Sequence, residues 1–191
     1  MKILEIFPSN IYTETSLGLN RNYILSLMNT IELFRRGDVN GAEKSNTTFG
    51  WQSHSLPHDG LFQILTNEIC KSGENFLNKL QIDYSKIHMQ NLWANINYHG
   101  DINWPHKHSG DIAGVYYLDV HDNCGDLLLD SYNYDERQKL QKFLKNKHRR
   151  CLKPEIDKLI LFDSGCIHAV LKNLSNKNRV SVSFNLKINE K

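Results

Sequence analysis

Two histidines one residue apart, His106 and His108, fall in a short polar loop of the sequence. Pro105 fixes the backbone just before them, and residues two apart in an extended segment point to the same side. Two imidazoles on one side can bind one metal ion. With 9 histidines among 191 residues, however, the triplet alone is weak support for a metal site and needs a third ligand. His168 offers one, because it emerges from a turn after a hydrophobic strand pattern in residues 159–170.

The strand pattern before the histidine pair has an unusual polar face. Strand side chains alternate between two faces, so the odd positions of residues 91–97 share one face. A row of amides is uncommon on a packing surface, because buried amides need hydrogen-bond partners. We therefore expect water or a ligand cavity beside this face. Its residues are Asn91, Trp93, Asn95 and Asn97.

The last strand pattern, in residues 179–186, also has one polar and one apolar face. Such alternation is typical of a strand that lies between a hydrophobic core and a wet space. Its odd positions are Arg179, Ser181, Ser183 and Asn185, and its even positions are Val180, Val182, Phe184 and Leu186.

In their order and spacing, these motifs resemble the Fe(II)- and 2-oxoglutarate-dependent oxygenases, and more narrowly a branch of the prolyl-hydroxylase-like superfamily. That branch has Asn-x-Trp-x-Asn-x-Asn before a histidine pair, Ser-Gly-Val-Tyr-Tyr after it and Arg-x-Ser-x-Ser-Phe-Asn near the end. The corresponding segments here are residues 91–97, 113–117 and 179–185. The second of them has Ala113 in place of the usual serine. A further similar segment is Phe-Gly-Trp-Gln-Ser at residues 49–53. The resemblance covers about residues 49–185.

The resemblance implies an Fe(II) site with His106 as the first ligand and His168 as the distal one. The second ligand of the wider superfamily is usually Asp, and its position falls on His108 in this chain. Three imidazoles leave the charge of the metal uncompensated, whereas a carboxylate would offset it. Asp111 and Asp126 therefore stay open as alternative second ligands. No catalytic residue beyond the metal ligands is expected.

The resemblance also implies 2-oxoglutarate as a cosubstrate. A 2-oxo diacid presents a distal carboxylate, which the guanidinium of Arg179 can bind in a bidentate fork that a lysine cannot reproduce. Ser181 lies on the same strand face and can donate to the same carboxylate. Tyr117 resembles the phenol that binds this carboxylate in related prolyl-hydroxylase-type oxygenases, or else it is a packed sheet aromatic. Asn95 and Asn97 either line the cosubstrate or substrate side or are structural sheet amides.

Composition and periodicity predict a single domain, residues 1–191, whose 40% hydrophobic content is ample for a core. Residues 1–85 should hold a strand and two covering helices, and residues 86–188 should form a barrel core of short strands. This pattern predicts a mainly β fold with N-terminal helices packed on an all-β barrel or sandwich. The resemblance narrows the fold to a double-stranded β-helix, a cupin-like jelly-roll barrel with the metal in its open mouth.

Local patterns predict the elements of the first part. Apolar residues recur at helical spacing in residues 17–36 and in residues 61–80, with Asp59 as a possible N-cap of the second helix. Residues 2–7 are expected to form a strand, and residues 37–50 a loop.

Residues 135–150 are strongly basic and carry apolar residues at helical spacing, which predicts a solvated surface helix or, alternatively, a lid or partner-binding element.

The net charge of +2 does not imply a nucleic-acid partner, and none is expected. The sequence shows no apolar run of membrane-spanning length and no leader, and its four cysteines lack CxxC spacing. We therefore expect a cytoplasmic protein with free thiols and no membrane partner.

The family resemblance implies that the chain is an Fe(II)- and 2-oxoglutarate-dependent dioxygenase that consumes O2, hydroxylates a small molecule or a peptide residue, and releases succinate and CO2. Two other classes stay open. Cys166 and His168 share a strand face, so with His106 and His108 they can form a zinc site of one thiolate and three imidazoles. Alternatively, the chain is a jelly-roll binding module without turnover.

Overall fold

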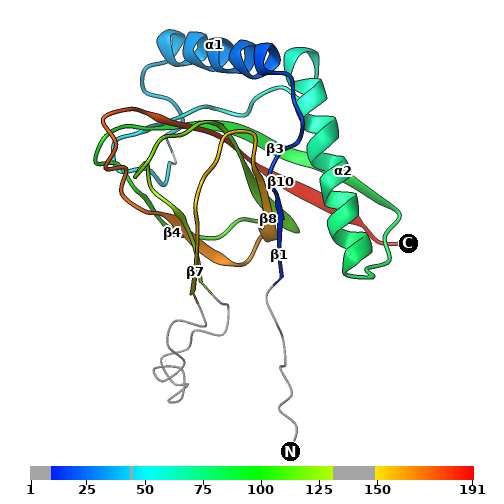
Figure 1. Ribbon diagram of the computed structural model, residues 1–191. Coiled ribbons are helices and arrows are strands. Elements are labelled where there is room, and N and C mark those ends of the chain that lie inside the picture. The colour runs from blue at the N-terminus through cyan, green and yellow to red at the C-terminus, as the bar shows by residue number, and fades with distance from the viewer. Residues whose placement is uncertain (1–9, 44, 131–148) are drawn as a thin grey trace, which may run out of the picture.

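The computed structural model describes residues 10–43, 45–130 and 149–191, which form two β-sheets and two α-helices (Figure 1). In chain order the elements are β1 (Ile11–Glu14), α1 (Arg21–Gly37), β2 (Trp51–Gln52), the 3-10 helix η1 (Gly60–Phe62), α2 (Gln63–Lys79), β3 (Lys86–Asn97), β4 (Asn103–His106), β5 (Ile112–Asp119), β6 (Leu127–Asp130), β7 (Arg149–Leu152), β8 (Leu159–Asp163), β9 (Ile167–Val170) and β10 (Arg179–Asn189).

The strands form a larger sheet in the order β1-β8-β5-β10-β3-β2 and a smaller sheet in the order β4-β9-β6-β7. Every neighbouring pair in both sheets is antiparallel. The inner faces of the two sheets share a small core, to which β5 contributes Val115, β6 Leu127 and β8 Phe162. Two facing antiparallel sheets under two N-terminal helices are a mainly β, jelly-roll architecture. The predicted fold class is therefore confirmed.

The helix α1 is amphipathic and covers the outer face of the larger sheet, as Figure 1 shows. Its Ile24, Leu27 and Ile31 are buried in a large core that also contains the outward-facing residues of β3, β5, β8 and β10. At its start, the Asn20 side chain accepts a hydrogen bond from the amide of Asn22 and caps the first turn. The helix thus forms because its apolar stripe matches the apolar outer face of the sheet.

Both helices begin later than the sequence predicted. The first was expected over residues 17–36 but starts at Arg21, because Gly18 has a left-handed φ of +70° that a right-handed helix does not contain. The second was expected over residues 61–80, but its first turn is η1, and the Asp59 side chain makes no capping hydrogen bond there. In the described part of the chain, neither helix has the length and apolar character needed to cross a membrane.

Two other predicted segments fall wholly or mostly outside the described residues. They are the strand at residues 2–7 and the basic helix at residues 135–150, of which Arg149 and Arg150 are described. These two arginines begin strand β7 instead of ending a helix. The described part of residues 37–50 is mostly loop, as predicted.

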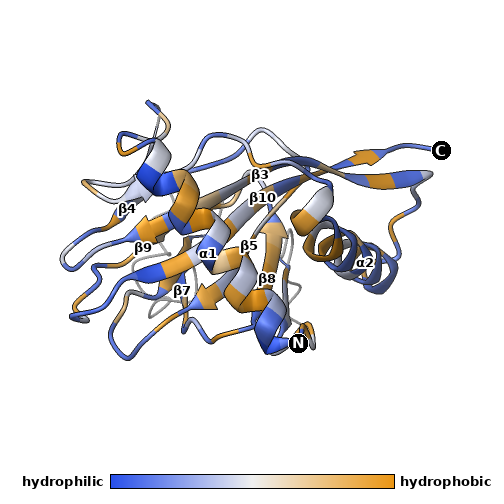
Figure 2. Ribbon diagram, turned by 90° about the horizontal axis from the view of Figure 1, so that it is seen from above, coloured by the Kyte–Doolittle hydropathy of each residue, from blue (hydrophilic) through white to orange (hydrophobic). Residues whose placement is uncertain are grey.

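The alternation along β10 turns its apolar face outward and its polar face inward. Val182 and Phe184 lie in the core under the helices, whereas Arg179 and Ser181 line an interior pocket. Figure 2 shows the corresponding changes of hydropathy along the strands. The register between β10 and β3 pairs their polar residues, matching Arg179 with Asn97, Ser181 with Asn95 and Ser183 with Trp93. The two predicted polar rows therefore lie side by side, next to a cavity, as expected.

Replacing Leu27 by alanine is expected to lower the free energy of unfolding by about 2–5 kcal/mol, because this fully buried side chain would leave a cavity between α1 and the sheet. The matched control is Leu33→Ala on the same helix, where the leucine is 65% exposed. The control should change the free energy by no more than about 0.5 kcal/mol. Urea unfolding followed by circular dichroism measures both values, and equal effects would contradict this orientation of α1.

Candidate functional site

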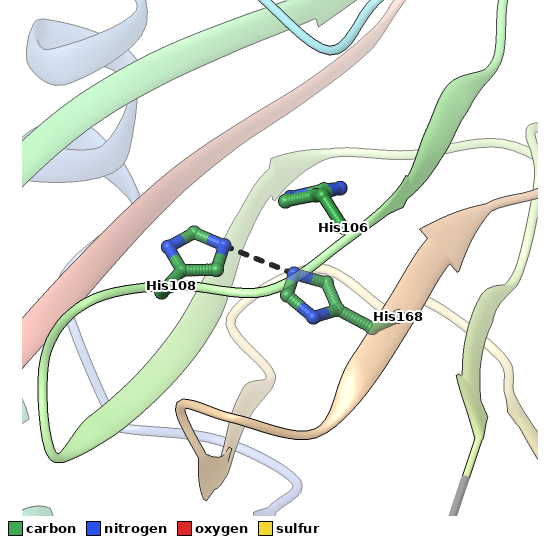
Figure 3. A group of neighbouring side chains, drawn as sticks. All are labelled: His106, His108 and His168. Atoms are coloured by element: carbon green, nitrogen blue, oxygen red, sulfur yellow. Dashed lines mark hydrogen bonds between the residues drawn. The ribbon is translucent and has the colours of Figure 1, made fainter. Parts of the chain in front are cut away.

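Three histidines converge on one point of the interior (Figure 3). Two of them belong to neighbouring strands, and the third lies in the segment that follows the first of these strands. His106 ends β4 and lies opposite His168 of β9, while the backbone amide of His108 donates to the carbonyl oxygen of Ser164. The ring centroids lie between 4.2 and 5.1 Å apart, and the candidate ligand nitrogens all lie within 4.8 Å of one another. The structure thus brings together the three histidines that the sequence singled out.

Backbone hydrogen bonds fix the orientation of two of these rings. Nδ1 of His106 lies 2.6 Å from the carbonyl oxygen of Trp104, and Nδ1 of His168 lies 2.9 Å from that of Cys166. Because a carbonyl oxygen can only accept, each Nδ1 carries the proton and each Nε2 keeps its lone pair. Backbone acceptors orient metal-binding histidines in this way. Both rings therefore keep Nε2 available for a cation.

His108 faces the other two rings at a spacing that suits a shared metal. Its Nε2 lies 3.0 Å from Nε2 of His168, as the dashed line in Figure 3 marks. Two nitrogens that are each about 2.1 Å from one metal and at right angles to each other lie about 3.0 Å apart. The His108 ring stacks on Trp93 with centroids 5.3 Å apart, and Phe162 makes a T-shaped contact with His168 at 4.8 Å. These aromatic contacts hold the rings in place.

Burial keeps the three imidazoles uncharged. Burial, together with the smaller effect of the neighbouring His106, lowers the pKa of His168 to about 3 and that of His108 to about 4. Burial also lowers the pKa of His106, against the opposing effect of the hydrogen bond to the Trp104 carbonyl. The neutral ring is the form that binds a metal. At neutral pH the group can therefore bind a cation without first releasing protons.

A buried arginine lines the same pocket. Arg179 is 1% exposed, and its Nη1 donates to Oδ1 of Asn97 at 3.1 Å and to Oγ of Ser181 at 3.2 Å. Its Nε and Nη2 have no hydrogen-bond partner among the described residues. The guanidinium lies over the ring of Tyr117, 5.0 Å from the centroid, and the Tyr117 hydroxyl is likewise buried and without a partner there. Charged donors buried without acceptors are costly, so this corner suits an anion.

One pocket joins the histidines to Arg179. It contains about 560 Å³ that protein atoms do not fill, part of it open to solvent. Amides and hydroxyls of β2, β3 and β10 contribute one part of its wall, and apolar residues of the inner core contribute another. Its described lining contains no carboxylate. With three neutral rings and one guanidinium, the pocket favours a negatively charged ligand.

The two amides predicted near the site have different surroundings. Asn95 lines the pocket, where it donates to Oγ of Ser183 at 3.0 Å and leaves its own buried Oδ1 without a partner among the described residues. Asn97 is fully buried, and its Nδ2 donates to Oδ2 of Asp101 at 2.8 Å and to Oδ1 of Asn103 at 2.7 Å. Since its Oδ1 also accepts from Arg179, protein groups already use both ends of the Asn97 amide.

Asp101 is the residue of this site that sequence reasoning missed. It is fully buried, and its Oδ1 accepts from the amides of Thr48 and Phe49 at 2.9 and 3.2 Å. One signal in the sequence could have pointed to it. Asn97 ends a row of inward-facing amides, and its buried NH2 group needs a hydrogen-bond acceptor nearby.

The two carboxylates considered as alternative metal ligands lie outside the histidine group. Asp111 accepts from a lysine side chain of β10 at 2.9 Å and from a backbone amide of the same strand at 2.7 Å, so both of its oxygens are engaged. Among the described residues, the group of potential ligands around this point contains His106, His108 and His168, without Asp111 or Asp126.

The proposed thiolate of a zinc site is also absent from this group. The thiol of Cys166 donates to the carbonyl oxygen of Asp130 at 3.0 Å, and burial raises the pKa of this thiol to about 11. A metal needs the thiolate, which such burial disfavours. The four cysteines are free, as predicted, but the structure does not bring Cys166 to the three rings.

Residues 91–185 match the model of a protein family described as "Putative 2OG-Fe(II) oxygenase". This segment contains β3 from Asn91 onward, the histidine triad and the polar end of β10. Among curated proteins, no match to the sequence was found.

Several solved structures share the fold over nearly the whole chain. A prolyl-4-hydroxylase of Pseudomonas putida is 13% identical with a TM-score of 0.65, covering 96% of this chain and 94% of that one. HygX of Streptomyces hygroscopicus, with nickel and 2-oxoglutarate bound, is 8% identical with a TM-score of 0.65, covering 94% and 83%. The non-heme alpha ketoglutarate dependent epimerase SnoN from nogalamycin biosynthesis is 10% identical with a TM-score of 0.71, covering 95% and 77%. At these identities the likeness shows a common fold.

The metal-free protein is expected to become less stable as the pH falls from about 7 to about 5. In the unfolded chain the imidazoles titrate near their ordinary pKa of about 6.5, whereas burial lowers the pKa of all three in the folded state. The unfolded state therefore takes up protons that the folded state does not, and the free energy of unfolding decreases below about pH 6.5.

The variant His108→Gln removes one of these groups and should lose less stability over the same pH range. Urea unfolding at pH 7, 6 and 5, above the range where most carboxylates titrate, measures this difference. Parallel pH profiles for the variant and the wild type would contradict the lowered pKa of His108.

Proposed function

Residues 91–185 belong to the 2OG-Fe(II) oxygenase family, and on that premise we propose that this protein is a hydroxylase with a three-histidine Fe(II) centre. The family makes the chain a 2-oxoglutarate- and Fe(II)-dependent oxygenase. Beyond that, we propose that it hydroxylates a small molecule or a peptide residue and releases succinate and CO2.

One observation carries the proposal. A single pocket contains both a neutral histidine triad and a buried guanidinium, two of whose donor atoms have no partner within the described part of the chain. A triad alone also suits zinc, and a buried arginine alone suits many anions. Together they match a ligand that binds a metal at one end and presents a carboxylate at the other, which is the chemistry of a 2-oxo diacid.

We propose that His106, His108 and His168 hold the metal through their Nε2 atoms. When bound, Fe(II) and 2-oxoglutarate supply an oxidation by O2 in which one oxygen atom enters a substrate C–H bond as a hydroxyl and the other enters succinate as CO2 leaves. The three rings add no charge, so the centre keeps the full charge of Fe(II). The dianionic cosubstrate would then offset the charge that a carboxylate ligand offsets in other oxygenases.

Arg179 would bind the distal carboxylate through Nε and Nη2, the two donor atoms that have no partner among the described residues. Ser181 supports this role, because its Oγ accepts from Nη1 of Arg179 and keeps its own proton to donate. Burial raises the pKa of the Tyr117 phenol, so that group also stays a donor. Asn95 borders the same space and would complete the polar wall.

The prime substrate would approach the side of the pocket where Asn46, Gln52 and Trp93 contribute to the wall. Solved structures with this fold include a Trichoplax adhaerens prolyl hydroxylase in complex with a peptide fragment, 11% identical with a TM-score of 0.63. They also include HygX with hygromycin B bound, 8% identical with a TM-score of 0.66. The fold therefore accommodates both peptides and small molecules, and both remain within the proposal.

The proposed function is tested by iron loading and by succinate formation. The purified protein should bind about one Fe(II) per chain and convert 2-oxoglutarate to succinate in the presence of O2, slowly even without a prime substrate. His168→Ala should lose both properties, because it removes one of three ligands. His54→Ala, which changes an exposed histidine, should keep both. Tightly bound zinc without succinate, or no metal at all, would support the zinc-site or binding-module alternatives instead.

Arg179→Lys should raise the apparent KM for 2-oxoglutarate by a factor on the order of 10 to 100, because an ammonium cannot reproduce the two-pronged contact of a guanidinium. The matched control is Arg36→Lys on α1, where the arginine is exposed and pairs with Glu32. Initial rates of succinate formation at varied 2-oxoglutarate concentration give both KM values. An unchanged KM in the first variant would argue against Arg179 as the carboxylate-binding group.

A further inference from the structure

Arg179 and Asp101 are both almost completely buried, and Asn97 connects them. Oδ2 of Asp101 accepts from Nδ2 of Asn97 at 2.8 Å, and Oδ1 of Asn97 accepts from Nη1 of Arg179 at 3.1 Å. The exposed fractions of the three residues are 0%, 0% and 1% in the order Asp101, Asn97, Arg179. A buried carboxylate and a buried guanidinium are therefore linked by one amide.

The carboxylate determines which way this amide faces. A side-chain amide has a donor end and an acceptor end, whereas an ionised carboxylate only accepts. Asn97 must therefore present its Nδ2 to Asp101 and, as a result, its Oδ1 to Arg179. The amide oxygen of Asn103 takes the second proton of the same Nδ2 at 2.7 Å, which favours the same orientation.

Asp101 itself is held on its other side. The amides of Thr48 and Phe49 donate to its Oδ1, and a Cβ atom at Gly50 would lie 2.1 Å from its Oδ2. Only glycine at position 50 leaves room for the carboxylate, since so close an approach excludes any side chain. The same loop continues into β2, where Gln52 lines the pocket. The carboxylate thus has a fixed place between the loop and the barrel interior.

We propose that Asp101 is a positioning residue for cosubstrate binding, which acts through Asn97 to hold Arg179 with its Nε and Nη2 directed at the distal carboxylate of 2-oxoglutarate. This inference rests on the proposed function. It gives Asn97 the role of the connecting group in place of a direct contact with the cosubstrate. The negative charge of Asp101 also stabilises the buried guanidinium before any cosubstrate arrives.

The variant Asp101→Asn tests this role with almost no change of shape. The amides of Thr48 and Phe49 would keep the new carbonyl oxygen on their side, so the new NH2 group would face Nδ2 of Asn97. Two hydrogen-bond donors would then face each other. If the Asn97 amide flipped to avoid this, its NH2 group would instead face the donors of Arg179. In protein loaded with Mn(II), calorimetry should show 2-oxoglutarate binding weakened about 10- to 150-fold, the range expected for loss of a buried hydrogen bond to a charged group.

Three further measurements distinguish positioning from a general loss of structure. The affinity for Mn(II) should stay unchanged, because Asp101 does not contact the histidine triad. In the Fe(II) enzyme, the KM for 2-oxoglutarate should rise by a larger factor than kcat falls. The variant Asn97→Ala removes the connecting amide, while Asp101 keeps its two backbone donors. It should weaken 2-oxoglutarate binding to a similar extent. It also serves as the test if Asp101→Asn does not fold.

The double variant Asp101→Asn with Asn97→Asp provides a rescue. It exchanges the two groups, so that the carboxylate now at position 97 accepts from the amide at position 101 and from Arg179, while the amide of Asn103 turns to donate. Most of the lost affinity for 2-oxoglutarate should return. A purely structural role of Asp101 predicts no such recovery.

The outcomes separate this inference from the proposed function. Wild-type protein that binds Mn(II) but not 2-oxoglutarate would overturn the proposed function itself. If the wild type binds 2-oxoglutarate, and Asp101→Asn and Asn97→Ala bind it equally well, the positioning role is overturned while the proposed function stands. Equal losses of Mn(II) and 2-oxoglutarate affinity, without recovery in the double variant, would also overturn it.

Discussion

The arrangement of the space between the two sheets depends on the burial of one guanidinium. Removing a cation from water costs several kcal/mol unless neighbouring groups compensate for the lost hydration. Around Arg179 the compensation comes from the hydroxyl of Ser181 on the same strand, and from the face of Tyr117 and the amide of Asn97 on the two strands beside it. These contacts use one end of the guanidinium and leave the other unsatisfied. The protein thus accepts an incomplete set of hydrogen bonds where a ligand can complete it.

The candidate site is divided between the two sheets. The smaller sheet supplies His106 and His168 from paired strands, with His108 just beyond, whereas the larger sheet supplies Arg179 and its partners. Packed sheets generally lie about 10 Å apart, and here the inner core fills the space between the two sheets. The distance between the histidine triad and Arg179 is therefore set by the side chains between the sheets. A ligand that reaches both must match this spacing, which selects for its length as well as its charge.

Much of this architecture is predictable from local patterns, because alternation along a strand directly assigns side chains to faces. The inward polar row of β10 and the convergence of His106, His108 and His168 follow from spacing together with the family resemblance. The predicted helix starts were too early, because Gly18 with its left-handed φ precedes the first helix and a 3-10 turn precedes the second. Asp101 was missed because the amide row of β3 indicates only that an acceptor is needed beyond Asn97, whereas the backbone amides of Thr48 and Phe49 that hold this carboxylate lie far away in the chain.

The packing of the helices against the outside of the larger sheet has a consequence for how such a protein can change over time. Most of the large buried apolar side chains belong to the layer between helices and sheet, while the inward face of β10 is polar. The residues that stabilise the fold and the residues that line the pocket thus lie on opposite faces of the same strands. Substitutions that change the shape of the pocket leave the hydrophobic layer intact. The substrate preference of such a protein can therefore change with little loss of folding stability.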